Sequence, residues 1–347
     1  MPEKKYLHRC FQLAVNGLGN VAPNPMVGAV IVYENSIIGE GFHEKFGGAH
    51  AEVNAIRNAI ENGFENLLSE STIYVNLEPC SHFGKTPPCC DLIIKYNFKK
   101  VVISNEDPFP EVAGNGIRKI KAAGIDVATS ILEAEGREIN KRFFTFYQKT
   151  RPFIILKFAQ SIDGFIAPEN PTLENRKISN ELSNKLVHQW RSEESAILVG
   201  TSTAAIDNPS LTVRNFTGKN PVRMVIDKEC KLPLTNSIFN KEAPTLIFND
   251  KKNEIIDNLE FIRLDFTGEI LNQINKIAFE KKILSILVEG GSKIHQQYIN
   301  LALWDEIRTI TAPFQLLSGT KSATFTGKVK ETFNLGSDQI SIIKPNN

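Results

Sequence analysis

Two stretches of the sequence decide how the first half of the chain is interpreted: His50-Ala51-Glu52, and Glu78-Pro79-Cys80-Ser81-His82-Phe83-Gly84-Lys85-Thr86-Pro87-Pro88-Cys89-Cys90. His50, Cys80 and Cys89 offer one imidazole and two thiolates, which are three ligands for a four-coordinate zinc ion. Three protein ligands leave one coordination position open, as in a catalytic zinc site and unlike a closed structural one. The pattern therefore predicts a zinc ion that binds and activates a water molecule.

Glu52 follows the histidine by two residues, close enough to reach that water without being a ligand. His-x-Glu followed by Pro-Cys and a second Cys is the pattern of zinc-dependent nucleobase deaminases, so we expect removal of an exocyclic amine from a heterocycle. A structural zinc with four protein ligands is the alternative. Cys90 would then be the fourth ligand, or would replace Cys89. Adjacent helical residues project about a hundred degrees apart, so one helix position rarely offers both.

Composition narrows the class of protein. The chain has 347 residues, 41% of them hydrophobic and 23% charged, which at roughly 150 residues per domain suggests two globular domains. A net charge of +1 argues against a nucleic-acid partner. No apolar run approaches the roughly 20 residues that cross a bilayer, so no membrane partner is expected. Five cysteines, three of them clustered, indicate metal binding in a reducing compartment, and we expect a cytoplasmic protein.

Residues 1–146 are expected to form one α/β domain. Alternating apolar residues predict strands at 27–33, 36–41, 72–77, 100–104 and 125–129, and helical spacing predicts helices at 6–18, 49–62, 89–96 and 116–123. This order predicts a mainly parallel sheet covered by helices on both faces. The metal ligands would then lie at helix starts and after a strand, where such sheets hold ligands.

A basic segment, 141–151, precedes Pro152, and there the pattern restarts, so we expect a second domain at 151–347. Strands are predicted at 153–158, 196–200, 222–227, 245–249 and 284–289, and helices at 181–193, 270–281 and 292–301. The motif that says most about the function of this second half is Glu289-Gly290-Gly291-Ser292, which lies between a predicted apolar strand and a predicted helix. Glycines there let a phosphate approach the backbone and the helix N-terminus. The dinucleotide fingerprint of the Rossmann fold is not present in this motif.

Several motifs in the first half resemble the deaminase domain of the bifunctional riboflavin-biosynthesis family RibD, also called RibG. They are Pro23-Asn24-Pro25-Met26-Val27-Gly28, His50-Ala51-Glu52 and the run from Glu78 to Cys89. Eight residues separate Cys80 from Cys89, whereas general nucleobase deaminases have two between their paired cysteines. The resemblance implies a cytidine-deaminase-like three-layer αβα fold, with ligands His50, Cys80 and Cys89 and with Glu52 as catalytic proton carrier. It also implies that Asn24, His43, His82 and Lys85 contact the substrate. Lys85 as an ordinary surface charge is the alternative.

In the second half, Lys157 to Gly164, Asp207 to Arg214 and Val288 to Gly291 resemble the family's reductase domain, so the resemblance covers nearly the whole chain. It implies a dihydrofolate-reductase-like α/β fold that uses NADPH. By position, the cofactor would be lined by Ala159, Lys177, Thr203, Asp207, Gly291, Ser292, Lys293, Ile294, His295, Gln296 and Gln297. The substrate would be lined by Asn175, Arg191, Leu211, Arg214 and Glu289. Arg191 and Arg214 suit a 5′-phosphate because guanidinium pairs with phosphate through two hydrogen bonds. Arg191 as a helix surface charge is the alternative.

Two positions depart from the family pattern. Phe109, in Asp107-Pro108-Phe109-Pro110, stands where the family has Asn, and Lys177 stands where it often has Trp.

The resemblance implies two reactions in one chain. Zinc-dependent hydrolytic deamination of 2,5-diamino-6-(5-phosphoribosylamino)pyrimidin-4(3H)-one comes first. NADPH then reduces the ribosyl chain of 5-amino-6-(5-phosphoribosylamino)uracil to ribityl. The partner would be a small-molecule pyrimidine ribotide phosphate, and the chain a homo-oligomer, dimer or tetramer. A nucleic-acid cytosine or adenine deaminase with an accessory domain is the alternative, against which the near-neutral charge and the long insert count. A non-enzymatic zinc-binding module would leave Glu52 without a role.

Overall fold

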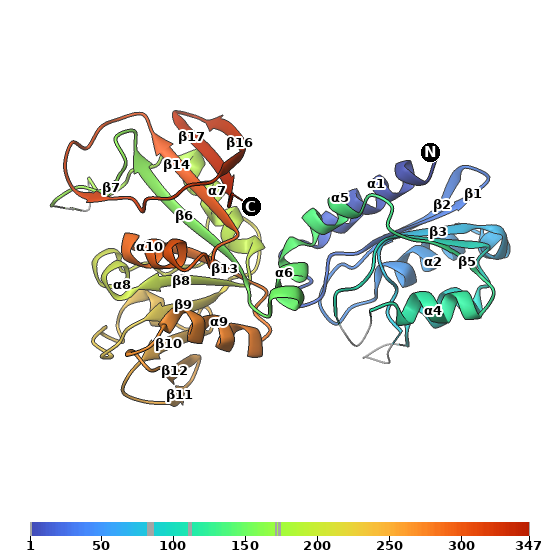
Figure 1. The fold of residues 1–347 in the computed structure, drawn as a ribbon, viewed down its shortest axis with the longest axis horizontal. Coiled ribbons are helices and arrows are strands. Elements are labelled where there is room, and N and C mark those ends of the chain that lie inside the picture. The colour runs from blue at the N-terminus through green and yellow to red at the C-terminus, as the bar shows by residue number, and fades with distance from the viewer. Residues whose placement is uncertain (1, 82–86, 110–112, 171, 173–174, 347) are drawn as a thin grey trace. The chain divides into compact units, whose positions relative to one another are not determined.

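The computed structural model describes residues 2–81, 87–109, 113–170, 172 and 175–346. The chain divides into two compact units, Met1–Thr150 (unit 1) and Arg151–Asn347 (unit 2), each with its own sheet and core (Figure 1). Within the described residues, no helix combines the length and the apolar character that spanning a membrane requires.

Unit 1 is built on a five-stranded sheet with the order β2-β1-β3-β4-β5. Its strands are β1 (Gly28–Tyr33), β2 (Ser36–Phe42), β3 (Thr72–Leu77), β4 (Lys100–Asn105) and β5 (Asp126–Ala128). β3, β4 and β5 are parallel, whereas β1 pairs antiparallel with both β2 and β3. Glu34 and Asn35 both adopt positive φ, as the two-residue hairpin turn between β1 and β2 requires. The polar pair Glu34-Asn35 between two β-rich runs predicts this hairpin, which is confirmed. The sheet is therefore mixed, and the prediction of a mainly parallel sheet missed the antiparallel pairing of β1 with β3.

Helices cover both faces of this sheet, as the sequence predicted (Figure 1). α1 (Pro2–Ala14) packs on one face, where Leu7 and Cys10 share a core with Val30. α2 (Ala51–Glu61), α3 (Cys89–Lys95) and α4 (Asn115–Ala122) pack on the other face, in the core that contains Ile31. Because side chains alternate along a strand, β1 sends neighbouring residues into two different cores. The three-layer αβα arrangement is confirmed.

The end of unit 1 differs from the sequence prediction. The residues that were expected only as a basic segment form a helix, α6 (Lys141–Lys149), which follows α5 (Glu133–Ile139). Phe143, Phe144 and Phe146 of α6 are buried. The Tyr147 ring lies 4.9 Å from that of Phe109, measured between centroids. The helix was missed because its lysines and arginine masked the apolar face.

Unit 2 contains a ten-stranded sheet with the order β11-β12-β10-β9-β8-β13-β6-β14-β17-β16. The strands are β6 (Phe153–Ser161), β8 (Ala196–Gly200), β9 (Val222–Ile226), β10 (Thr245–Asn249), β11 (Glu254–Ile256), β12 (Leu259–Arg263), β13 (Ser285–Gly290), β14 (Glu306–Ala312), β16 (Lys328–Leu335) and β17 (Asp338–Lys344). From β12 to β14 all neighbours are parallel, and antiparallel strands close both edges. β7 (Phe165–Ala167) and β15 (Thr320–Lys321) form a separate pair.

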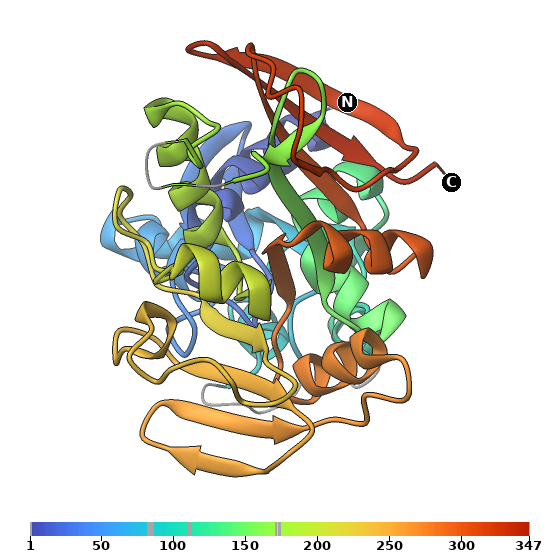
Figure 2. The same ribbon diagram turned by 90° about the vertical axis from the view of Figure 1, so that its left-hand side faces the viewer.

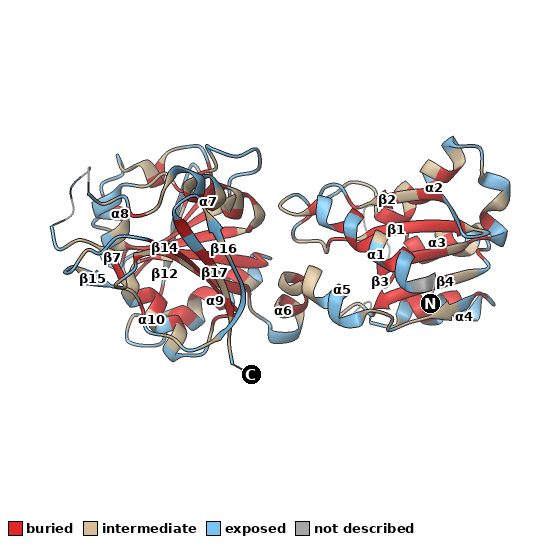
Figure 3. Cartoon of the chain, turned by 90° about the horizontal axis from the view of Figure 1, so that it is seen from above, coloured by how far each residue is buried: buried red, intermediate tan, exposed pale blue. Residues whose placement is uncertain are grey.

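Helices again lie on both faces of the sheet (Figure 2). α9 (Ile270–Glu280) and α10 (Ser292–Asn300) pack on one face, in a core with Leu156 and Leu198. α7 (Glu181–Glu193) and α8 (Thr201–Asp207) pack on the other, where Trp190 and Ala204 are buried. The central strands are buried, whereas the helices expose one side (Figure 3). The sequence prediction found β6, β8, β9, β10 and β13 but missed β12, β14, β16 and β17. Most residues of β16 are exposed.

Candidate functional site

The three predicted zinc ligands meet at one point of unit 1. The ligand atoms of His50, Cys80 and Cys89 all lie within 4.8 Å of one another. His50 Nδ1 is 3.6 Å from Cys80 Sγ and 3.3 Å from Cys89 Sγ. A tetrahedral zinc ion with Zn–N and Zn–S bonds of about 2.0–2.3 Å separates its ligand atoms by roughly 3.5 Å. The donor set and its spacing therefore fit zinc, with a fourth position left for a water molecule.

Three separate elements supply these ligands. His50 is the residue that caps the start of α2, Cys80 follows β3, and Cys89 begins α3. The Cys89 backbone N–H donates to Cys80 Sγ at 3.3 Å. Hydrogen bonds with Cys89 and His50 lower the pKa of the Cys80 thiol to about 4, which favours the thiolate that binds a metal ion.

Cys90, the alternative ligand, lies in a different environment. It is fully buried in the apolar core beside Ile93 and is absent from the group of converging ligand atoms. Burial raises the pKa of its thiol to about 11, so it remains a protonated, apolar side chain.

Glu52 lies in the first turn of α2, directly beside this cluster. It is 3% exposed, and its carboxyl is close enough to Cys80, His50 and Cys89 for each to affect its pKa. Burial, followed by the charge of Cys80, raises the pKa of the Glu52 carboxyl. A buried carboxyl with a raised pKa is suited to accept a proton and to return it.

The loop that carries Asn24 is held by two buried asparagines. Asn140 Oδ1 accepts a hydrogen bond from Met26 N at 2.8 Å, and Asn76 Nδ2 donates to Met26 O at 3.0 Å. Asn76 Oδ1 also accepts from Gly28 N at 2.7 Å, which joins the loop to the start of β1. Sequence reasoning missed both asparagines. Asn76 had a signal, since it is a polar residue inside an apolar strand.

His43 lies between this loop and the metal ligands. Its Nε2 is 3.1 Å from Asn24 Nδ2, and its Nδ1 is 2.9 Å from the carbonyl oxygen of Ala49. Its ring centroid is 5.2 Å from that of His50, and the side chain is 2% exposed. Burial lowers the pKa of His43. The other two predicted substrate contacts, His82 and Lys85, lie outside the described residues.

Glu78 is a second residue that sequence reasoning left without a role. Its carboxylate accepts hydrogen bonds from the backbone N–H groups of Asp107, Gly114, Gly116 and Ile117. It therefore ties the segment after β4 and the start of α4 to the end of β3. Cys80 follows Glu78 by two residues, so the same carboxylate steadies the strand end that carries this predicted metal ligand.

In unit 2, two of the predicted cofactor residues, Thr203 and Gly291, meet where β8 and β13 end. These neighbouring parallel strands lead directly into α8 and α10, so both helices begin at one edge of the sheet. A Cβ atom on Gly290 would lie 3.2 Å from Thr203 Oγ1, and one on Gly291 would lie 3.5 Å from it. Two glycines thus keep open a space that side chains would fill, beside helix N-termini that offer N–H groups to a phosphate. This arrangement fits a dinucleotide such as NADPH.

The run from 291 to 297 does not present all its side chains to this space. Ile294 and His295 are buried, and His295 Nε2 lies 3.0 Å from the carbonyl oxygen of Val288. Gln296 exchanges hydrogen bonds with the backbone of Thr324 at 2.9 and 3.2 Å. Lys293 and Gln297 are exposed, as is Lys177. Contacts of these residues with a cofactor stay predictions, as do those of Ser292, Ala159 and Asp207.

The predicted substrate residues include a buried ion pair. The Arg191 guanidinium donates to both carboxylate oxygens of Glu289, at 2.8 and 2.7 Å, and to the carbonyl oxygen of Thr212 at 3.3 Å. The Arg191 and Glu289 side chains are 11% and 7% exposed. Arg191 and Lys157 together hold the pKa of the Glu289 carboxyl at about 2 in spite of its burial. Arg191 is therefore already paired within the protein, and its predicted phosphate contact stays a prediction.

The remaining substrate candidates have diverse surroundings. Arg214 contacts the hydroxyl groups of Ser210 and Thr212, and its backbone N–H donates to His188 Nδ1 at 3.1 Å. Leu211 is 2% exposed in an apolar core. Asn175 is exposed and its side chain bonds to the neighbouring loop backbone.

Lys157 and His188, both close to Glu289, were not predicted as site residues. A signal existed for Lys157, which is a lysine inside the otherwise apolar strand β6.

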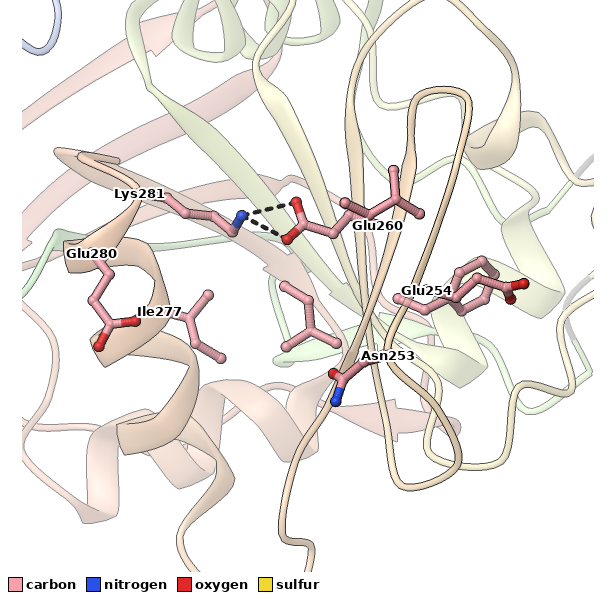
Figure 4. Close-up of a pocket in the computed structure, with 9 residues that line it drawn as sticks. Asn253, Glu254, Glu260, Ile277, Glu280 and Lys281 are labelled. Atoms are coloured by element: carbon pink, nitrogen blue, oxygen red, sulfur yellow. Dashed lines mark hydrogen bonds and ion pairs between the residues drawn. The ribbon is translucent and has the colours of Figure 1, made fainter.

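A separate groove lies at the outer edge of the sheet in unit 2, between β11, β12 and α9 (Figure 4). It is bordered by the ion pair of Lys281 with Glu260 at 2.7 Å. None of the catalytic, metal, cofactor or substrate residues predicted from the sequence lines this groove, and we assign the groove no part in deamination or reduction.

Comparison with known proteins agrees with both halves. Residues 1–105 match the family described as the cytidine and deoxycytidylate deaminase zinc-binding region, and residues 152–340 match the RibD C-terminal domain. The riboflavin biosynthesis protein RibD of Aquifex aeolicus is 39% identical, over 99% of this chain and 98% of that protein. Its Escherichia coli counterpart is 33% identical, over 90% and 88%.

Solved structures give the same result. The crystal structure of a diaminohydroxyphosphoribosylaminopyrimidine deaminase/5-amino-6-(5-phosphoribosylamino)uracil reductase from Thermotoga maritima is 36% identical. It superposes with a TM-score of 0.90 over 99% of both chains. Acinetobacter baumannii RibD, at 29% identity, also has a TM-score of 0.90, over 100% of this chain and 99% of that one.

Proposed function

The chain belongs to the RibD family, and from this premise we propose which of its residues carry the family's two activities. The protein is a zinc-dependent deaminase and an NADPH-dependent reductase of riboflavin biosynthesis. We assign deamination of 2,5-diamino-6-(5-phosphoribosylamino)pyrimidin-4(3H)-one to a domain at 1–146. We assign reduction of the ribosyl chain of 5-amino-6-(5-phosphoribosylamino)uracil to a domain at 151–347.

In the deaminase half, His50, Cys80 and Cys89 would hold zinc, which supplies a water activated for attack near neutral pH. Glu52 accepts a proton from the attacking water. It returns protons to a ring nitrogen and then to the departing amine, so that ammonia leaves and a carbonyl remains. Asn24 binds the pyrimidine edge, and His82 and Lys85 bind the ribose phosphate. The convergence of three ligand atoms beside a buried Glu52 is the observation that carries this proposal.

In the reductase half, NADPH supplies the hydride. Thr203 and the Gly290-Gly291 turn leave room for its phosphates at the ends of β8 and β13. Glu289 and Arg214 bind the substrate, and Arg191 holds the Glu289 carboxylate in place through two hydrogen bonds. The partner is then a small pyrimidine ribotide phosphate and not a nucleic acid.

We also propose that the protein acts in the cytoplasm as a homo-oligomer, dimer or tetramer. All five cysteines are free thiols in the structure, which suits a reducing compartment. Light scattering of the purified chain measures the oligomeric state, and a monomer at micromolar concentration would contradict the second part.

Glu52→Gln tests the proposed role of the carboxylate. The amide keeps the shape of the side chain but cannot carry a proton, so ammonia release should fall by roughly 10²–10⁴-fold. Zinc content should stay at one ion per chain, and NADPH oxidation with the deaminated intermediate should be unchanged. Glu61→Gln, an exposed position at the end of the same helix, is the matched control. Deamination by Glu52→Gln at the wild-type rate would overturn the assignment.

A further inference from the structure

We propose that His43 is a positioning residue that orients the side-chain amide of Asn24, so that Asn24 presents its oxygen and not its nitrogen to the substrate. The inference rests on the proposed function of the deaminase half, in which Asn24 contacts the pyrimidine. It assigns His43 a role behind Asn24 in place of a direct contact with the ribose phosphate. A side chain that is 2% exposed, with both ring nitrogens in hydrogen bonds, has little left to offer a ligand.

The hydrogen bond to Ala49 determines which ring nitrogen of His43 carries the proton. A backbone carbonyl can only accept, so Nδ1, 2.9 Å from the Ala49 oxygen, must be the donor. On the other side of the ring, Nε2 lies 3.1 Å from the amide nitrogen of Asn24, which has no lone pair to accept a proton, so the ring carries only the proton on Nδ1. In neutral imidazole, a proton on Nδ1 leaves Nε2 with a lone pair. Nε2 is therefore a hydrogen-bond acceptor.

An acceptor at Nε2 has only one good partner on Asn24. The amide nitrogen, 3.1 Å away, donates to it, whereas a flipped amide would place an oxygen lone pair against a nitrogen lone pair. The backbone leaves little other freedom, because Asn24 N donates to Val21 O at 2.9 Å and the asparagines around Met26 hold the rest of the loop. The direction of the amide is thus set by a chain of bonds that starts at a backbone carbonyl.

The oxygen of the Asn24 amide is then the group left for a ligand. The side chain is half-buried, and within the described ranges its only side-chain hydrogen bond is the one from Nδ2 to His43, so Oδ1 has no partner there. An amide oxygen accepts from an amino group or a ring N–H and repels a carbonyl. The diaminopyrimidine has several such donors on its ring. His43 therefore makes the position at Asn24 selective for a donor on the heterocycle, with one buried imidazole separating this position from the metal ligand His50.

Two conservative substitutions of His43 separate its two hydrogen bonds. In His43→Asn the shorter amide can replace Nδ1 and donate to Ala49, but it does not reach Asn24. In His43→Gln the longer side chain can place a carbonyl oxygen near the position of Nε2 and accept from Asn24. We expect His43→Asn to raise the KM for the diaminopyrimidine ribotide about tenfold or more with a smaller change in kcat, and His43→Gln to recover most of the loss. A misoriented or missing hydrogen bond of this kind corresponds to about a tenfold change in affinity.

The experiment uses the full-length, zinc-loaded protein and includes a double-variant cycle with Asn24→Ala. Once Asn24 is truncated, His43→Asn should change KM no further, because His43 acts through Asn24. Equal KM values for the Asn and Gln variants would refute the inference, as would an undiminished effect of His43→Asn in the Asn24→Ala background. Loss of zinc from His43→Asn would also overturn it, since the role of His43 would then be to support His50.

A binding measurement distinguishes this inference from the proposed function itself. The dissociation constant of the diaminopyrimidine ribotide is measured by calorimetry with Glu52→Gln as the parent, in which turnover should be slowed by roughly 10²–10⁴-fold. His43→Asn should weaken that binding about tenfold. Turnover by the Glu52→Gln parent at the wild-type rate would put the proposed function at fault, whereas unaltered affinity on adding His43→Asn would put the positioning role at fault.

Discussion

Replacing Gly41 of β2 with alanine tests how the fold of unit 1 places its metal centre. Gly41 faces α2, and a Cβ atom there would lie 2.3 Å from Ala55 N and 2.7 Å from Ala51 O. These are backbone atoms of a buried helix and cannot turn aside as a flexible side chain can. Ordinary contact begins at 3.4 Å, so α2 must move away from the sheet by about 1 Å. The substitution therefore displaces α2 relative to β2.

The same displacement reaches the chemistry, because His50 caps the start of α2 and Glu52 lies in its first turn. Overpacking of this kind lowers the free energy of unfolding by about 1–3 kcal/mol. A misplacement of ~1 Å at a catalytic group costs about 10²-fold in rate. We therefore expect Gly41→Ala to lower the melting temperature of unit 1, weaken zinc retention against a chelator, and reduce ammonia release about a hundredfold.

Calorimetry, zinc analysis and an ammonia assay measure these three effects, and NADPH oxidation with the deaminated intermediate serves as the internal control. Gly268→Ala is the matched control variant, because the nearest atom to its added Cβ would be 3.8 Å away. It should leave all readings unchanged. Gly41→Ala with a full complement of zinc and wild-type deamination would refute the claim that the close approach of β2 positions α2.

Cys80→Ser and Cys89→Ser should each lose zinc because a serine hydroxyl stays protonated, whereas Cys90→Ser should keep its zinc. If metal analysis shows that Cys90→Ser loses zinc and Cys89→Ser keeps it, the proposed set of ligands is wrong. Burial lowers the pKa of His295 from 6.5 to about 4, so its stabilising effect is complete above pH 6.5 and is lost as the pH falls towards 4. Denaturant unfolding of the wild type should show the free energy of unfolding fall by on the order of 3 kcal/mol over that pH range, and His295→Gln should lack this contribution. Parallel plots of unfolding free energy against pH for the two proteins would contradict the prediction. Glu289→Gln should lower the free energy of unfolding of unit 2 by ~3 kcal/mol or more, because Arg191 is left buried without its counter-charge. Glu229→Gln, which removes the carboxylate of an exposed ion pair with Lys231, is the control and should have little effect. Equal unfolding midpoints for the two variants would exclude the buried ion pair as a determinant of the stability of unit 2.

Much of this protein was determined locally and could be predicted from the sequence alone. Most strands of both sheet centres follow from runs of apolar, β-branched residues, and the β1–β2 hairpin follows from the polar pair Glu34-Asn35, whereas β14 was not predicted. The three predicted zinc ligands converge in the structure, and each is a metal-binding residue type next to a strand end or a helix start. These signals lie within a few residues of the feature that they predict, so no knowledge of distant contacts was needed.

Other features were decided only when the chain folded. Arg191 pairs with Glu289 across 98 residues, and the tautomer of His43 depends on the carbonyl of Ala49, whose position depends on how β2 meets α2. β13 lies between β8 and β6, so the glycine turn at 290–291 comes to Thr203, and no local pattern specifies that strand order. α6 could not be predicted because charged residues alternate with its phenylalanines, and the sequence does not show which of them become buried. The physical reason is common to all of these: the ionisation and hydrogen bonding of a buried polar group depend on which partner shares its low-dielectric environment, and that partner is supplied by the tertiary structure.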